Sequence, residues 1–191
     1  MKEDRILTWW QERLSGLEID VCPAVDFPDN EEGGAFASLT VASLDTDRDT
    51  LTAAFAYTLA KFTSQAESLF WMREGGTCHP FYVSFDETAP AGDFLADVTA
   101  RRADALDHPY ADEAGLAEAL GLNRELLLSF DEDAAPDPAG EWKLCLSQTD
   151  GALCLFYREE WYLRENMRRL AETVVSVAKQ LPGIAFLRDL T

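Results

Sequence analysis

The stretch CHPFYVSFDETAPAGDFLADVTARRADALDHPYADEAGLAEALGL, residues 78–122, decides the fold. It predicts a β-strand, a turn, a long amphipathic helix and a shorter helix that ends at Gly121. Pro80 favours an edge strand or the start of a strand, because proline cannot donate a hydrogen bond to a ladder. Both histidines of the chain, His79 and His108, lie in this stretch. It is therefore the first place to look for an active site.

The flanking sequence extends this alternation of helices and strands in both directions. Helices are expected over residues 3–15, 44–62, 93–106, 112–120 and 163–180. Strands are expected over residues 35–43, 68–73, 79–85, 125–130, 142–147 and 153–158. The pattern predicts an α/β (α+β) protein: a two-layer mixed sheet with helices packed on it.

Three local details belong to this prediction. Asp45 or Thr46 is expected to cap the helix over 44–62, because short polar side chains accept hydrogen bonds from the first turn. Asp-Gly at the tip of QTDG, residues 148–151, predicts a hairpin between the last two strands. After Pro182, the segment IAFLRDLT is expected to trail off as an extended tail.

The length and composition favour one globular domain. The chain has 191 residues and is 47% hydrophobic, with eleven Phe and five Trp. That is enough for one core and too apolar for a disordered chain. A division near residues 131–140 would leave one hairpin and one helix, which is too small a core to stand alone.

The chain is strongly acidic, with a formal net charge of −19. Residues 86–137 alone hold 14 acidic residues against 3 arginines. Nucleic acid and anionic membranes are therefore not expected as partners, since both need a basic face. A solvated acidic face is the favoured interpretation, and a docking face for a basic protein partner is the alternative.

The cysteines and the ends of the sequence indicate a cytoplasmic protein. Cys22, Cys78, Cys145 and Cys154 have no metal-binding spacing and no CxxC motif, so buried free thiols are expected. The opening MKEDRILTWW lacks the apolar region of a signal peptide, and no stretch is long and apolar enough to cross a membrane.

The residues that could carry chemistry form no specific motif. His108 lies near a helix end, where a structural role is favoured by the helix dipole. Cys78 and His79 are not expected to pair, because adjacent strand residues point to opposite faces. Asp107 could orient the ring of His108, but an acidic neighbour is expected by chance in so acidic a stretch.

The aromatic cluster Phe156, Tyr157, Trp161 and Tyr162 favours core and rim over a ligand cage. We therefore assign no catalytic, cofactor-binding or metal-binding residue, and we expect no cofactor.

The order of elements, and several segments, resemble a known family. The segments are WWQERLSGL (9–17), GAFASLTV (34–41), LTAAFAYTLAKFTSQAESLFWM (51–72), the strand and helices of 79–108, LAEALGLNRE (116–125) and the hairpin and long helix of 142–181. Together they resemble the C-terminal half of nonribosomal peptide synthetase condensation domains, of the chloramphenicol-acetyltransferase-like superfamily. The resemblance implies half of that fold over residues 1–181. It also implies an exit linker over residues 182–191, leading to an adenylation domain.

Two family motifs that this sequence lacks or shortens determine the function that we expect. The family's His-His-x-x-x-Asp-Gly motif lies in the other half, and this sequence has no His-His pair. The Arg/Asn-Pro-Phe segment of the family is also shortened here to ELLLSF, residues 125–130. The resemblance thus implies a truncated, non-catalytic condensation-like domain, a platform for an adenylation domain or a carrier protein of a synthetase. The alternatives are half of a split acyltransferase completed by another chain, and an independent acidic interaction protein.

Overall fold

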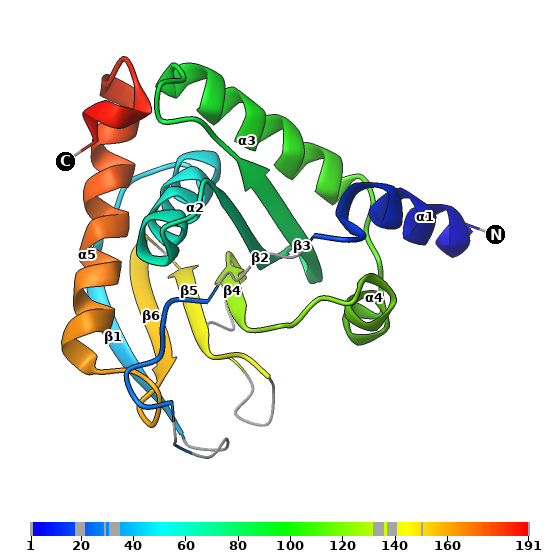
Figure 1. Cartoon of the computed structure of the whole chain (residues 1–191), viewed down its shortest axis with the longest axis horizontal. Coiled ribbons are helices and arrows are strands. Elements are labelled where there is room, and N and C mark those ends of the chain that lie inside the picture. The colour runs from blue at the N-terminus through cyan, green and yellow to red at the C-terminus, as the bar shows by residue number, and fades with distance from the viewer. Residues whose placement is uncertain are drawn as a thin grey trace.

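The structure is a computed structural model that describes residues 2–17, 22–28, 30, 35–131, 136, 141–149 and 151–190. Its strands form a six-stranded sheet in the order β1-β6-β5-β4-β2-β3 (Figure 1). The strands are β1 Phe36–Ser43, β2 Glu67–Glu74, β3 Thr77–Ser84, β4 Leu126–Ser129, β5 Leu144–Thr149 and β6 Ala152–Arg158. The neighbours β2, β4 and β5 run parallel, and the other pairs are antiparallel. The mixed sheet is as predicted.

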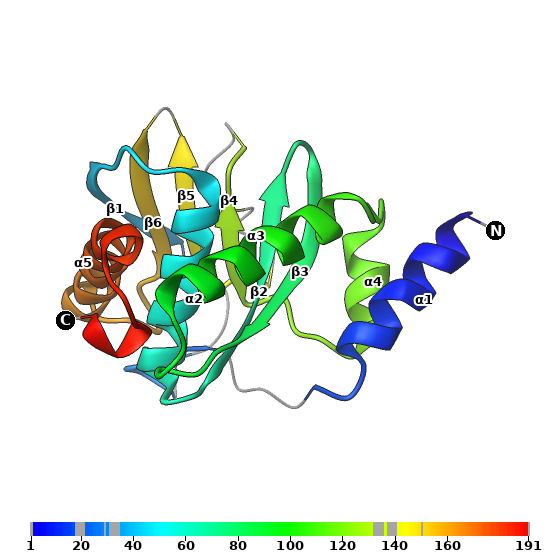
Figure 2. The ribbon, with the colours of Figure 1, turned by 90° about the horizontal axis from the view of Figure 1, so that it is seen from above.

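Three helices cover one face of this sheet: α2 Arg48–Thr63, α3 Ala91–Leu106 and α5 Arg164–Gln180 (Figure 2). Helix α2 lies between α3, α5 and the sheet, and it is buried on all sides from Thr50 to Ala60. A helix without a polar face belongs inside a protein, which fits this central place. Phe55, Phe70 and Leu170 are among the residues packed here. We call this set of side chains the large core.

A second set of side chains lies on the opposite face and around the free edge of β3, under α1 Lys2–Leu14 and α4 Glu113–Leu120. We call it the small core: Trp10, Leu14, Trp71, Cys78, Ala105, Leu116, Ala117, Leu120, Leu127, Trp142 and Cys145. It covers the β2–β3–β4 side of the sheet. On the β1 side of the same face, Ser38 and Thr40 are exposed.

The N-terminal cap of α2 differs from the prediction. The cap is Asp47, and neither Asp45 nor Thr46. The Asp47 carboxylate accepts from the Thr50 backbone N–H at 2.8 Å and from the Thr50 hydroxyl at 2.8 Å. Asp47 is the cap because it directly precedes the first helical residue, where its side chain reaches the free N–H groups of the first turn.

Three other local predictions are confirmed. β3, which carries Pro80, is an edge strand of the sheet. Gly121 closes α4 in the left-handed conformation, with φ 67°. The hairpin between β5 and β6 also forms, with each strand reaching further toward the turn than expected, while Asp150 lies outside the described residues.

The C-terminal segment is not an extended tail, so that expectation is wrong. It forms two short 3₁₀ turns, η1 Leu181–Gly183 and η2 Leu187–Asp189. Leu187 is fully buried in the large core, and its carbonyl accepts from the Tyr57 hydroxyl at 3.3 Å. The segment also bonds to the start of α3, where the Ala91 N–H donates to the Ala185 carbonyl at 3.0 Å. The role of residues 182–191 as a linker stays a prediction.

The acidic segments are only partly within the described residues. Residues 132–135 and 137–140 lie outside them, as do residues 18–21, 29 and 31–34. Among the helices of the described residues, none combines the length and the apolar composition that a membrane span requires.

Candidate functional site

His79 lies on β3 and is completely buried. Neither of its ring nitrogens has a hydrogen-bond partner. Burial lowers the pKa of His79 to about 4, an effect that the nearby Glu74 opposes and the nearby Arg102 reinforces. The ring is thus neutral at neutral pH and has no carboxylate bonded to it, so it lacks the surroundings of a general base.

His108 follows the C-terminal end of α3, as predicted for a structural histidine. Its Nδ1 lies 2.7 Å from the Asp104 carbonyl oxygen. Its ring stacks on Trp9, with centroids 3.8 Å apart and planes at 8°. The Nδ1 contact is with this carbonyl, so Asp107 does not hold the ring as an orienting carboxylate.

The cysteines are free thiols. Cys78 and Cys145 are buried, as expected, whereas Cys22 and Cys154 are only partly buried. Cys78 packs in the small core, whereas Met72, the cross-strand partner of His79, packs in the large core. The adjacent Cys78 and His79 therefore point to opposite faces, as expected. Burial raises the pKa of Cys145 and of Cys22 to about 12, and it raises that of Cys78 as well. Such thiols are poor nucleophiles, because the thiolate is the reactive form.

Burial also confirms the interpretation of the C-terminal aromatic cluster. Tyr157 and Tyr162 are buried in the large core, with Trp161 beside them. Phe156 faces the other side of the sheet and is half-buried. The four rings thus divide between the two faces and form no cage.

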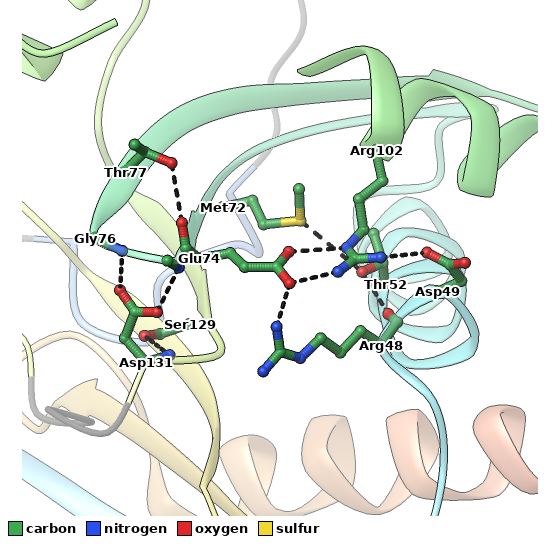
Figure 3. Close-up of polar contacts among 11 residues, drawn as sticks. Arg48, Asp49, Thr52, Met72, Glu74, Gly76, Thr77, Arg102, Ser129 and Asp131 are labelled. Carbon is green, nitrogen blue, oxygen red and sulfur yellow. Dashed lines mark hydrogen bonds and ion pairs between the residues drawn. The ribbon is translucent and has the colours of Figure 1, made fainter. Parts of the chain in front are cut away.

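A group of four charged side chains, not anticipated from the sequence, joins three elements at one end of β2 (Figure 3). Glu74 is buried and accepts from Arg102 through two bonds, at 3.0 Å to Nε and 2.5 Å to Nη2. It also accepts from Arg48, while Arg102 donates to Asp49 at 2.7 Å. We call these four residues the ionic cluster.

The ionic cluster lies beside Phe130 and behind the β2–β3 turn. Arg48 and Arg102 lie over the Phe130 ring, at 5.4 and 5.8 Å from its centroid. At the turn, the Asp131 carboxylate accepts from the Gly75 and Gly76 N–H groups at 2.8 and 3.1 Å (Figure 3). The first contact ties the end of β4 to α2 and α3, and the second ties it to the β2–β3 hairpin.

The ionic cluster is suited to holding structural elements in position. Its two carboxylates and two guanidinium groups balance in charge, and each carboxylate is already bonded to arginine. Such bidentate arginine–carboxylate pairs fix geometry. In the described part of the chain, no group of three or more His, Cys, Asp or Glu side chains is placed to hold a metal ion. The ionic cluster therefore locks α2, β2 and α3 together.

Two surface pockets flank Trp9 of α1. One, of about 320 Å³, lies between α1, α3 and the edge strand β3, with Trp10, Pro80 and Tyr82 among its walls. The other, of about 470 Å³, lies between α1 and the end of α3, beside His108. Among the described side chains of α1, Trp10 and Leu14 are the buried ones, whereas α5 buries seven.

Comparison with solved structures identifies the fold. No model of a protein family matches the sequence, and no curated protein matches it. A four-domain nonribosomal peptide synthetase bound to AMP and glycine matches all of this chain with a TM-score of 0.79, at 11% identity over 20% of its own length. The X-domain from teicoplanin biosynthesis, solved in complex with OxyB, matches all of the chain at 0.71, with 18% identity over 55% of its length.

A starter condensation domain of rhizomide synthetase, in complex with C8-CoA, also matches the whole chain, with a TM-score of 0.70 at 13% identity. The chain covers 55% of that structure, so it spans about half the length of single-domain structures that it matches. Identities this low show the fold alone. The chain therefore has the fold of about half of a condensation domain or X-domain, as the resemblance implied.

Proposed function

We propose that this chain is a non-catalytic, condensation-like half-domain that serves as a docking platform in a nonribosomal peptide synthetase, next to an adenylation domain. One observation carries the proposal. Both histidines have structural surroundings: His79 is buried without a partner, and His108 is stacked on Trp9. A half-domain without an acid–base pair has the condensation fold but not the means to transfer an acyl group.

The surface of the described residues supports a stable platform. The large hydrophobic side chains exposed there are Phe27, Phe62 and Leu163, at 39%, 37% and 47%. An obligate half of a split acyltransferase needs a broad apolar face for its other half. Three exposed side chains, two of which (Phe27 and Leu163) lie in segments bonded to each other, are too few for such a face.

The compared structures support protein docking as the role. The X-domain of teicoplanin biosynthesis was solved as a complex with another protein, OxyB. The four-domain synthetase contains the same fold as one part of a larger chain. By analogy, this chain would offer a surface to a neighbouring protein.

The test compares a parent synthetase with and without residues 1–191. We expect deletion to reduce both soluble yield and the rate of amino-acid-dependent ATP–pyrophosphate exchange. A matched variant, Glu172→Gln on the exposed face of α5, should leave both unchanged. Equal yield and equal exchange rate after deletion would remove the platform role.

A second measurement addresses the absence of catalysis. The purified chain is incubated with an acyl donor and an amine acceptor, each loaded on a carrier protein, and the amide product is measured by mass spectrometry. We expect no product above the protein-free reaction. Product formation that the His79→Leu variant abolishes would overturn the non-catalytic assignment.

A further inference from the structure

The two adjacent tryptophans of α1 contact both histidines of the chain. Trp9 stacks on His108, and the Trp10 ring lies 6.0 Å from that of His79, centroid to centroid, with planes at 27°. The Trp10 Nε1 also donates to the His108 carbonyl at 3.1 Å. Helix α1 is therefore held to the rest of the domain partly through contacts with two titratable rings.

Side chains from three elements lie beside His79. Strand β2 places Met72 opposite it and Glu74 nearby, α3 contributes Arg102, and α1 contributes Trp10. Among the charged groups facing it, the Glu74 carboxylate favours a protonated ring and the Arg102 guanidinium disfavours it. Glu74 is already bonded to both arginines of the ionic cluster. It cannot turn to a protonated His79 without breaking those bonds.

These three elements are held in place to different degrees. Strand β2 pairs with β3 along its whole length, and α3 is fixed by the bonds from Arg102 to Glu74 and Asp49. Helix α1 is attached through the Trp10 hydrogen bond, ring stacking and the small core. Because Trp10 and Leu14 are the buried side chains among those described in α1, it is the element that separates most easily from His79.

We propose that α1 is a pH-sensitive strap: protonation of His79 favours a state in which α1 has left the edge of the sheet and water reaches the imidazolium. A buried charge without a hydrogen-bond partner is strongly unfavourable, and opening the least tightly held cover relieves it. Neutral His79 favours the closed strap and protonated His79 the open one. The strap is independent of the proposed docking role, and either can fail alone.

The test is hydrogen–deuterium exchange of the full chain, read by mass spectrometry at pH 7.5 and pH 5.5 and corrected for the intrinsic exchange rate. His79 has a pKa of about 4 when buried. With an ordinary value near 6.5 when hydrated, the protection of α1 should fall roughly tenfold between these two pH values. Helix α5, in the large core, should keep a larger protection factor at both.

Three variants separate this proposal from a general loss of stability. His79→Leu should make the protection of α1 independent of pH over this range, and His79→Met serves as a second apolar replacement. His108→Leu removes the stacking partner of Trp9, so α1 should exchange faster at both pH values but keep the tenfold dependence. The proposal is overturned if α1 protection is constant in the wild-type chain, if α1 and α5 have equal protection, or if the His79 variants keep the dependence.

Discussion

The two faces of the sheet bury their side chains in different ways. Over the large core, α2 is buried on every side from Thr50 to Ala60 and enclosed by α3, α5 and the sheet. Over the small core, α1 and the eight-residue α4 are amphipathic and pack beside indole rings, thiols and surface pockets. A helix enclosed on all sides cannot leave without unfolding the domain, whereas a helix at the edge can open by itself. This difference predicts where substitutions reduce global stability and where they act locally.

Truncation of one buried side chain on each face gives the largest contrast. Phe55 in the large core and Leu116 in the small core are both fully buried. We expect Phe55→Ala to lower the free energy of unfolding by about 4 kcal/mol, because it leaves a cavity that the enclosed helix cannot collapse. Leu116→Ala should lower it by about 2 kcal/mol, since the short α4 can shift or open. Urea denaturation followed by far-UV circular dichroism measures both, and equal losses would contradict the difference between the faces.

The ionic cluster and the ion pairs of α4 provide a second contrast. Glu74→Gln removes a nearly buried carboxylate that holds Arg48 and Arg102, so we expect a loss of about 3 kcal/mol. Glu113→Gln removes a carboxylate that is 28% exposed and bonded to Arg124, and we expect a loss below about 1 kcal/mol. The same denaturation experiment compares the two. A loss at Glu74 no larger than that at Glu113 would show that the ionic cluster does not lock the three elements.

The dependence of global stability on pH follows from His79. Its pKa is lowered to about 4 by burial, so between pH 7.5 and 5.5 the unfolded chain binds a proton that the folded chain does not. Stability should fall by about 1.4 kcal/mol as the pH drops over this range. His79→Leu should remove that part of the fall, whereas His108→Leu should retain it. Urea midpoints of the three proteins at both pH values are the measurement, and identical slopes for wild type and His79→Leu would contradict the assignment.

Local patterns predicted the elements well. The change from alternating to helical spacing between residues 78 and 122 gave β3, α3 and α4 in the right order. Pro80 indicated the edge strand because the missing N–H is a local property that no tertiary contact can restore. Gly121 indicated the end of α4 for a similar reason, since the left-handed conformation favours glycine.

Contacts between residues far apart in the chain could not be predicted from the sequence. Arg48, Glu74 and Arg102 come from three elements, and each lies among other charges, so nothing in a single sequence singles out their pairing. The burial of Leu187 likewise depends on a space that exists only once α2 and α3 are in place. The contacts of Trp9 and Trp10 with the histidines have the same origin. Spacing predicts which side of a helix is buried, but not which side chains it meets.

The helix caps give the smallest contrast between the two faces. Asp47 caps α2 and bonds to Thr50, and Asp112 caps α4 and accepts from the Gly115 N–H at 2.9 Å. We expect Asp47→Ala to lower the free energy of unfolding by about 1 kcal/mol, because α2 must form for the large core to exist. Asp112→Ala should lower it by about 0.5 kcal/mol or less and should instead accelerate hydrogen exchange in α4. Equal global losses from the two caps would mean that α4 unfolds only with the rest of the domain, so that the small core is as cooperative as the large one.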